Sequence, residues 1–319
     1  MSVAQRMKYD AILLLGFGGP NAPEEIRPFV DRVLGGHKIP AARYEQVLSN
    51  YARIGGKSPY NERTQEQATA LADALRDRGI DTPVELALRN SAPFLTDVLE
   101  RLTADRAHRV LGIVLSPFQG AAAWDKYVRG ADEARQRIGP SAPTIDYIEP
   151  YFEHPLFVRA HAHRVMEAFS RFGGSAQDDI TLIFTAHSIP SATPGAERYV
   201  RQFTRSAQLI AAASGAKSWE LAYQSRSGSP MDPWLEPDIR DLLKALPARG
   251  SNAAVVSPIG FLCDHVELLY DLDIDASNVA QAVGVRIERA GALNDHPLFI
   301  QMLAELSHAN MLRSVGAAT

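Results

Sequence analysis

Short apolar runs alternate with longer segments of helical periodicity along the whole chain. The runs have the length of ordinary strands, and the segments between them repeat apolar residues at helical spacing. This alternation predicts parallel sheets with helices on both faces, because each parallel pair needs a long crossover that a helix supplies. We expect strands at Ala11–Leu15, Val84–Leu88, Val110–Leu115, Thr144–Tyr147, Ile180–Thr185, Glu220–Tyr223, Ala253–Val256 and Gly284–Ile287.

The chain length predicts two domains. A chain of 319 residues exceeds what one hydrophobic core usually organises, and four of the expected strands fall in each half. We therefore expect an α/β protein of two similar doubly wound domains, over residues 1–150 and 151–319, with the last helix packing back on the first domain. The expected helices between the strands are Glu24–Leu34, Glu66–Arg78, Pro93–Thr103, Trp124–Ile138, Leu156–Phe169, Tyr199–Ser214 and Ile239–Leu246.

A short sequence motif is repeated once in each expected domain region, as an internal echo near the start of a helix. Glu153–Phe157 reads Glu-His-Pro-Leu-Phe, and Asp295–Phe299 reads Asp-His-Pro-Leu-Phe. Each places a proline in the first turn of an expected helix, where its missing N–H leaves no bond unmade. The echo fits a repeated domain, and two unrelated helix starts remain the alternative.

Composition narrows the class of protein. A net charge of −4 and a pI near 6.1 argue against non-specific nucleic-acid binding. The single cysteine, Cys263, rules out a disulfide framework and any all-cysteine metal site within one chain. Apolar runs are too short to span a membrane, and the polar stretch Met1–Lys8 is followed by no signal-peptide core. We expect a cytoplasmic protein.

The strongest proton-active pair is His187 with Glu267. In open α/β sheets ligands gather beyond the carboxyl ends of the strands, and both residues follow expected strands. On a regular helix Glu267, Asp271 and Asp275 would follow one another at i, i+4 and i+8 along one face. Such a row is placed to pass a hard divalent cation inward. A solvated acidic face and a structural histidine are the alternatives, which the residues alone leave open.

Other strand ends carry groups suited to the wall of a ligand site. The first strand is followed by a glycine-rich turn, Gly16–Pro20, whose spacing is not that of a dinucleotide fingerprint. Ordinary turns and an ordinary proline-rich loop are the alternatives at these positions. The candidate binding groups at strand ends are Phe17, Arg89, Asn90, Phe118, Gln224, Ser225 and Trp234. Separately, Arg53, Lys57 and Ser58 form a small cationic group within Tyr51–Pro59 that could bind a carboxylate, with an exposed charge cluster as the alternative.

Taken together, these motifs resemble the ferrochelatases, the iron-inserting enzymes of haem synthesis. The resemblance extends from Leu13 to about Leu306. Motifs in the same order and spacing form a much stronger signal than any one of them alone. They are Ala186–Pro190, Tyr223–Arg226 with Pro233–Pro237, Pro258–Phe261 with Asp264–Glu267, Ile54–Pro59 and Leu88–Asn90.

The resemblance implies two Rossmann-like chelatase domains with a porphyrin held in the cleft between them. It makes His187 the metal-site histidine, Glu267 the carboxylate that faces it, and Asp271 and Asp275 outer acids of the metal route on a helix with a π-type widening. Phe17, Phe118 and Trp234 would contact the macrocycle. Arg53, Lys57, Arg89 or Lys126 would hold its propionates.

The chain also departs from the family pattern. Where relatives carry Gly-Asp-Pro-Tyr after the histidine motif, this chain has Thr193–Tyr199, in which only Tyr199 corresponds. Phe17 stands where soluble relatives often have a tyrosine that ligates iron. With Cys263 alone, no [2Fe–2S] cluster is expected.

The expected function is insertion of Fe²⁺ into a porphyrin, with coproporphyrin III favoured and protoporphyrin IX the other candidate substrate. The short connection between Leu34 and Tyr51 resembles the soluble type of the family. We expect a monomer without a tightly bound cofactor or a transmembrane anchor, with a transient haem-accepting protein as partner. A non-catalytic haem or porphyrin carrier is the alternative.

Overall fold

Two four-stranded parallel sheets organise the molecule in a computed structural model that describes residues 9–121, 123–173, 179–227 and 232–316. The first sheet has the order β2 (Val84–Leu88), β1 (Ala11–Gly16), β3 (Arg109–Val114) and β4 (Thr144–Tyr147). The second has the order β6 (Trp219–Gln224), β5 (Thr181–His187), β7 (Ala253–Ser257) and β8 (Arg286–Arg289). The expected fold class is confirmed, and the strand ends differ from expectation by at most two residues.

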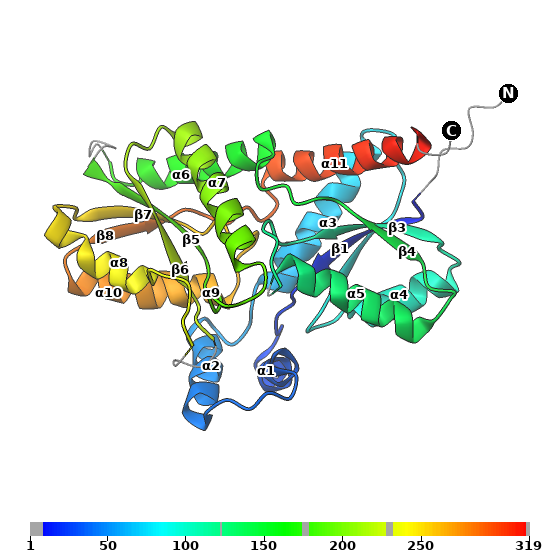
Figure 1. Ribbon diagram of the computed structural model, residues 1–319, viewed down its shortest axis with the longest axis horizontal. Coiled ribbons are helices and arrows are strands. Elements are labelled where there is room, and N and C mark those ends of the chain that lie inside the picture. Colours follow the sequence, from blue (N-terminus) through cyan, green and yellow to red (C-terminus); the bar gives the residue numbers. More distant parts are fainter. Residues whose placement is uncertain (1–8, 122, 174–178, 228–231, 317–319) are drawn as a thin grey trace.

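The central strands are apolar because helices cover both of their faces. Every residue of β1 is buried, and β5 is buried as far as Ala186. Such continuous burial explains why these runs lack the polar–apolar alternation of a half-exposed strand. The flanking helices are α3 (Tyr60–Arg76), α4 (Leu95–Ala104), α5 (Trp124–Ile138), α6 (Pro155–Ser170), α7 (Ala196–Ser214), α8 (Ile239–Ala245) and α10 (Ser277–Ala282) (Figure 1).

A helical pair, α1 (Ile26–Leu34) and α2 (Ala41–Arg53), lies below both sheets in Figure 1. Most of the short connection between Leu34 and Tyr51 is helix α2, an element that was absent from the expected helices. The apolar side of α2 packs on α1, and the ring centres of Tyr51 and Phe29 are 6.1 Å apart. The other side of α2 is exposed and polar, which hid the helical pattern.

The last helix, α11 (Pro297–Gly316), packs against α3 of the first half and α6 of the second. One core cluster accordingly contains β1 residues such as Leu14 together with Phe157 of α6 and Phe299 of α11. The two halves share this core, so a rigid relation between the sheets follows from burial of apolar surface.

The internal echo has the same local structure at both places. His154 Nδ1 accepts a hydrogen bond from the Leu156 N–H at 3.3 Å, and His296 Nδ1 accepts one from the Leu298 N–H at 3.2 Å. Each histidine thus caps the helix that its proline begins. The cap explains why the two short motifs read alike.

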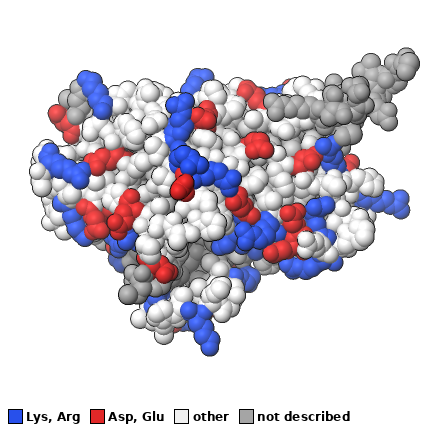
Figure 2. Space-filling model, viewed as in Figure 1, with Lys and Arg blue, Asp and Glu red and all other residues white. Residues whose placement is uncertain are grey.

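Across the described ranges, none of the helices combines the length and the apolar character that crossing a membrane requires. Acidic and basic side chains are interspersed over the face seen in Figure 2, in keeping with the small net charge. The stretch Met1–Lys8 and residues 228–231 of the proline-rich loop lie outside the described residues.

Candidate functional site

His187 and Glu267 meet at the carboxyl ends of neighbouring strands. His187 is the last residue of β5, and Glu267 lies in α9 (Val266–Leu269), which follows β7. His187 Nε2 lies 3.6 Å from Glu267 Oε1, and each side chain is about one-third exposed, at 30% and 32%. The pair sits where the strand order of the second sheet reverses, the usual place for a ligand in such sheets.

The ring of His187 is held in one orientation. Its Nδ1 donates to the carbonyl of Ser188, so the neutral ring carries its proton on Nδ1. The Nε2 lone pair then faces Glu267. The hydroxyl of Tyr199 donates to the His187 carbonyl at 3.1 Å and fixes the backbone behind the ring.

The two side chains shift each other's pKa. Burial alone would lower the pKa of His187, but the Glu267 carboxylate more than offsets this, so the pKa of His187 is raised above 6.5. Burial alone would raise the pKa of Glu267, but His187 keeps it below its usual value. The resting pair therefore favours an ionised carboxylate beside an imidazole that holds a proton more tightly than usual.

Glu267 owes its position to contacts within its own segment after β7 and to one from the end of β6. His265 caps α9, since its Nδ1 accepts from the Glu267 N–H at 3.2 Å. The buried Gln224 amide at the end of β6 donates to the Glu267 carbonyl at 2.6 Å. Gly260 lets the loop after β7 lie directly on β5, because an added Cβ would stand 2.7 Å from the Ala186 Cβ.

The row of acids does not follow a regular α-helix. Residues Asp271–Ala276 form a π-helical turn, in which the Asp275 N–H donates to the Tyr270 carbonyl at 2.8 Å. Ser225 Oγ donates to Asp271 at 2.5 Å, and burial followed by the Glu267 charge raises the pKa of Asp271 to about 7. Asp271 can therefore carry a proton near neutral pH.

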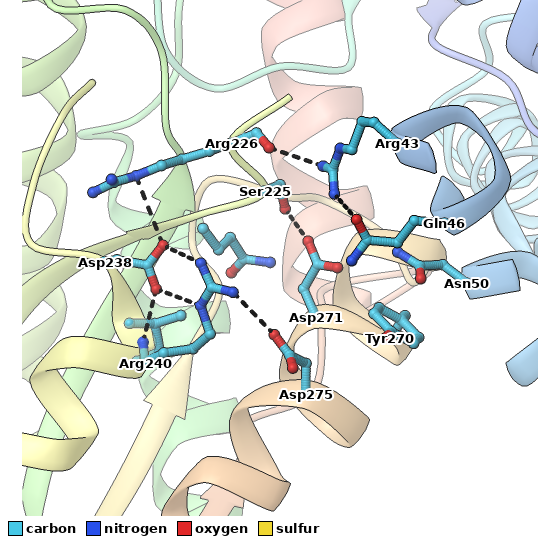
Figure 3. A pocket seen from close by; sticks show the side chains of 12 residues that line it. Arg43, Gln46, Asn50, Ser225, Arg226, Asp238, Arg240, Tyr270, Asp271 and Asp275 are labelled. Atoms are coloured by element: carbon cyan, nitrogen blue, oxygen red, sulfur yellow. Dashed lines mark hydrogen bonds and ion pairs between the residues drawn. The ribbon is translucent and has the colours of Figure 1, made fainter. Parts of the chain in front are cut away.

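A polar pocket lies beyond Asp271 (Figure 3). Arg240 makes two 2.9 Å hydrogen bonds from its guanidinium to the buried Asp238 and reaches Asp275 at 3.5 Å. Arg43 of α2 donates to the Arg226 carbonyl at 2.9 Å across the pocket. The outer acid Asp275 thus already has a cationic neighbour. The residues that line the pocket are Arg43, Gln46, Asn50, Gln224, Ser225, Arg226, Asp238, Ile239, Arg240, Tyr270, Asp271 and Asp275.

Sequence reasoning missed Asp238, Arg240 and Arg43. Asp238 is the N-cap of α8 and accepts from the Arg240 N–H at 2.9 Å. An aspartate just before an apolar-periodic run is a recognisable cap signal, so Asp238 could have been found. Nothing in the sequence pairs Arg43 or Arg240 with residues so far away in the chain.

The loop after β1 is locked in place by buried polar groups. The Asn90 amide donates to the Phe17 carbonyl at 3.0 Å, so Asn90 shapes this loop. Gly18 has a φ of +94°, and a Cβ there would collide with Ser91. Ser58 is 4% exposed and donates its backbone N–H to the Pro20 carbonyl. Phe17 remains partly exposed and packs edge-on against Phe29.

The other expected binding groups divide between core and surface. Phe118 is 1% exposed and packs on Tyr199 and Phe203, so it lies in the core and supports the residue that holds His187. This burial removes Phe118 from the surface that we expected to contact a macrocycle. Arg53 donates to the Tyr270 hydroxyl at 3.2 Å, and Arg89 lies over the ring of Tyr127.

Trp234 lies where the loop after β6 is hydrogen-bonded to the loop after β5. Trp234 forms an isolated β-bridge with Pro190, and the Leu235 N–H donates to the Ile189 carbonyl at 3.0 Å. The loop after β6 therefore braces the loop that follows His187. Trp234 is partly buried at this junction.

No group of three or more His, Cys, Asp or Glu side chains in the described part of the chain is arranged to hold a metal ion. The site offers an open pair, His187 with Glu267, and not a closed cage. Such a pair suits a metal that passes through better than one that stays.

The sequence matches the family model described as Ferrochelatase over residues 9–311. It is 38% identical to a coproporphyrin III ferrochelatase of Mycolicibacterium smegmatis, with 94% of this chain and 89% of that protein covered. It is 37% identical to a ferrochelatase of Rhodopirellula baltica, with 93% of this chain and 85% of that protein covered.

Among solved structures, the chain is similar to SirB from Bacillus subtilis with Fe³⁺. The TM-score is 0.60 at 14% identity, with 96% of this chain and 97% of that chain covered. A sirohydrochlorin chelatase SirB bound to cobalt gives a TM-score of 0.58 at 15% identity, with 96% of this chain and 97% of that chain covered. At these identities the likeness concerns the fold alone.

Proposed function

The chain belongs to the ferrochelatase family, and from this premise we propose that it inserts ferrous iron into coproporphyrin III in haem biosynthesis. It is a porphyrin metal chelatase, a lyase. Coproporphyrin III is favoured over protoporphyrin IX because several of the similar relatives are named for it. The observation that carries the proposal is the His187–Glu267 pair at the strand ends.

The reaction exchanges two pyrrolic protons of the porphyrin for Fe²⁺, so both protons must leave as the iron–nitrogen bonds form. His187 Nε2 presents a lone pair to the site in the neutral state, which suits it to accept a proton near pH 7. Glu267 balances the imidazolium that results. A cleft that favours a bent macrocycle would tip the nitrogen lone pairs toward the metal.

We assign the outer acids to transfer between solvent and the pair. Asp271 lies within electrostatic reach of Glu267, His187 and Asp275. With its pKa raised to about 7, it can release a proton when a cation arrives and take one up when the cation leaves. Asp275 would be the outermost of these acids, beside Arg240.

Substrate contacts are assigned by side-chain chemistry. Phe17 and Trp234 would meet the apolar macrocycle, and Arg53 and Arg89 would meet its propionates. Ser58, Asn90, Gln224 and Ser225 would act by holding the surrounding loops, as their present hydrogen bonds support.

Iron enters as substrate, and we propose that the protein holds no tightly bound cofactor. Cys263 is 2% exposed, and burial raises the pKa of its thiol above the usual range, so it is poorly suited to bind metal. We further propose a cytoplasmic monomer that passes haem product to a transient acceptor protein.

The test is an anaerobic assay of the purified chain with Fe²⁺ and either coproporphyrin III or protoporphyrin IX. Loss of free-base porphyrin absorbance over many turnovers is expected, faster with coproporphyrin III. Stoichiometric binding without turnover on either porphyrin would contradict the proposal and favour a porphyrin carrier.

The first variant removes the imidazole of the His187–Glu267 pair. His187→Ala should lower the rate of metal insertion by about 10²–10⁴-fold, because the general base is lost. Far-UV circular dichroism and porphyrin binding should stay close to those of the wild type. Near-normal insertion by a folded His187→Ala protein would show that another group takes the protons.

A further inference from the structure

Arg289, the last residue of β8, bonds to two acids that stand on either side of Glu267 in the chain. Its Nε and Nη2 donate to the two carboxylate oxygens of Asp273, at 2.5 Å and 3.0 Å. Its Nη1 donates to Asp264 Oδ1 at 3.1 Å. Contacts in which a guanidinium donates twice to one carboxylate are among the stronger hydrogen bonds of proteins. The Arg289 side chain is only 18% exposed, so solvent screens these bonds little.

Asp264 is also fixed from its other side. Asn294 Nδ2 donates to Asp264 Oδ2 at 2.8 Å, and the Asp264 N–H donates back to Asn294 Oδ1 at 3.0 Å. The Asn294 carbonyl in turn accepts from the amide of Gln67 in α3 at 2.8 Å. Gln67 is fully buried. The start of the segment that carries Glu267 is therefore tied to the first half of the molecule.

Asp273 lies inside the π-helical turn, between Asp271 and Asp275. A π-type turn is rare in proteins and closes its hydrogen bond over one more residue than an α-helical turn. Because one guanidinium holds both Asp264 and Asp273, the chain between them has a fixed span. Relaxation to a regular α-helix would rotate and shift Asp273, since each residue of an α-helix turns by about 100° and rises by about 1.5 Å. The contacts of Arg289 therefore favour the π-type turn.

We propose that Arg289 is a positioning residue for metal insertion, because its bonds to Asp264 and Asp273 set where Glu267 and Asp271 stand. We call these three residues, Arg289, Asp264 and Asp273, the Arg289 clamp. The inference rests on the proposed function, since it takes Glu267 and Asp271 to serve the reaction. Arg289 acts through the two acids that it holds, so a change at Arg289 should displace both ends of the segment together.

The first experiment compares Arg289→Gln and Arg289→Lys with the wild type in the anaerobic insertion assay. Arg289→Gln should lower kcat at least about tenfold, because a small displacement of reacting groups is costly, while KM for coproporphyrin III stays within about twofold. Arg289→Lys keeps the charge but not the planar fork, so it should recover only part of kcat. Wild-type kcat in either variant would overturn the positioning role.

Loss of charge and loss of position predict different results for the metal. Removal of a cation near the acids would by itself favour Fe²⁺, so KM for Fe²⁺ would fall while kcat was kept. Displacement of Glu267 should instead lower kcat without a gain in affinity for Fe²⁺. A lower KM for Fe²⁺ at wild-type kcat in Arg289→Gln would attribute the effect to charge and overturn the inference.

Asp273→Ala breaks the same contact from the side of the turn, where the side chain is 34% exposed and its loss threatens folding less. This variant should also lower kcat. The double variant Arg289→Gln/Asp273→Ala should be within about twofold of Arg289→Gln, because one contact is lost in both. Losses that multiply would show that the two residues act separately. Wild-type kcat in Asp273→Ala would overturn the clamp even where Arg289→Gln fails to fold.

Arg101→Gln is the matched control, because it removes the same chemical group from a similar contact in the first half. Arg101 donates to the two carboxylate oxygens of Glu85 at 3.1 Å and 2.8 Å. The control should leave kcat unchanged. A loss of kcat in Arg101→Gln as large as that in Arg289→Gln would attribute the effect to the loss of any such ion pair and overturn the inference.

Hydrogen exchange of the backbone amides tests the clamp without turnover. Exchange over residues 262–276, followed by mass spectrometry, should be at least about tenfold faster in Arg289→Gln than in the wild type and unchanged in Arg101→Gln. Unchanged exchange in Arg289→Gln would overturn the clamp. Absence of turnover in the wild type would contradict the proposed function, while the exchange rates would still report on the clamp.

Discussion

At the scale of single residues, the site depends on charges that offset burial. Partial burial of His187 by itself would favour its neutral form, yet Glu267 holds a proton on the ring. Asp271 shows the reverse case, since burial and Glu267 both favour its protonated form. One carboxylate, Glu267, therefore sets the protonation of both neighbours.

Glu267→Gln should shift the pH dependence of the reaction. In the wild type the pKa of His187 lies above 6.5, so the neutral base is lost as the pH falls below that raised value. Without the carboxylate, burial dominates and the pKa falls, so the acidic limb of kcat/KM should move to lower pH while the maximum rate drops. The profile is measured between about pH 5.5 and pH 8.5.

Glu288→Gln is the control for this experiment, because Glu288 lies on β8 and pairs with Arg171. The acidic limb of kcat/KM for Glu288→Gln should match that of the wild type. If Glu267→Gln leaves the limb in place, then His187 is not the titrating base.

Asp271→Asn should stabilise the fold at alkaline pH. The pKa of Asp271 is about 7 in the folded state and about 3.8 in the unfolded chain, so folding stability is lost as the pH rises through about 7. Asparagine cannot ionise and still accepts from Ser225. The variant should be more stable than wild type by about 1–3 kcal/mol at pH 8 and nearly equal near pH 4.

Urea denaturation at the two pH values measures this difference. Asp241→Asn, a change of an exposed acid on α8, is the matched control. If Asp271→Asn changes the free energy of unfolding equally at both pH values, the effect comes from packing and not from the charge of Asp271.

At the scale of elements, two irregular features bring the site together. The π-helical turn after α9 re-aims the acids that follow Glu267, so that Asp271 meets Ser225 and Asp275 meets Arg240. The loop after β7 lies on β5 at Gly260, whose N–H donates to the Thr185 carbonyl at 3.1 Å. Both features set where α9 begins relative to the end of β5.

Gly260→Ala should damage activity more than stability. The added methyl would stand 2.7 Å from the Ala186 Cβ and 2.8 Å from its Cα, so backbone must move next to His187. We expect a loss of about 1–3 kcal/mol in the free energy of unfolding, and at least about a tenfold fall in kcat because the pair is displaced.

In contrast, Gly130→Ala in α5 should stabilise the protein. The added methyl would have the flexible Arg89 side chain as its nearest neighbour, at 3.9 Å, so the free energy of unfolding should rise by about 0.5–1 kcal/mol. Thermal melts and the insertion assay measure both variants. Full activity of Gly260→Ala would mean that the loop adapts without moving the pair.

At the scale of the whole molecule, a shared core joins the two sheets. The cluster that contains Leu14 and Leu88 of the first sheet also contains Phe157 and Phe299. Because α11 contacts both α3 and α6, the distance between the strand ends of the two halves is fixed by apolar packing. The two halves should therefore unfold together.

Phe299→Ala should lower stability without splitting the unfolding transition. Phe299 is fully buried and packs on Tyr151, so the cavity should cost about 3–5 kcal/mol. Calorimetry should show one transition, as it should for Phe203→Ala, which opens a cavity in the core cluster around β5. Two separated transitions in either variant would show that the halves fold independently.

The sequence by itself determined the class of fold and the residues available for chemistry. Apolar runs such as Ala11–Leu15 and Ile180–Thr185 are read directly from the sequence, because burial on both faces requires continuous apolar residues. His187 and Glu267 could be singled out because they follow such runs. The spacing of Asp271 and Asp275 after Glu267 suggested a cation route, whereas the π-type turn came only through resemblance to a family.

Only the tertiary structure decided which groups meet. The 3.6 Å approach of His187 to Glu267 depends on the pairing of β5 with β7 and on the capping of α9 by His265. The burial of Phe118, the helix α2 and the Arg240–Asp275 contact also stayed hidden. The burial of Phe118 and the Arg240–Asp275 contact arise between residues distant in the chain, and the exposed polar face of α2 masks its helical pattern. Sequence periodicity reports only local geometry and average burial.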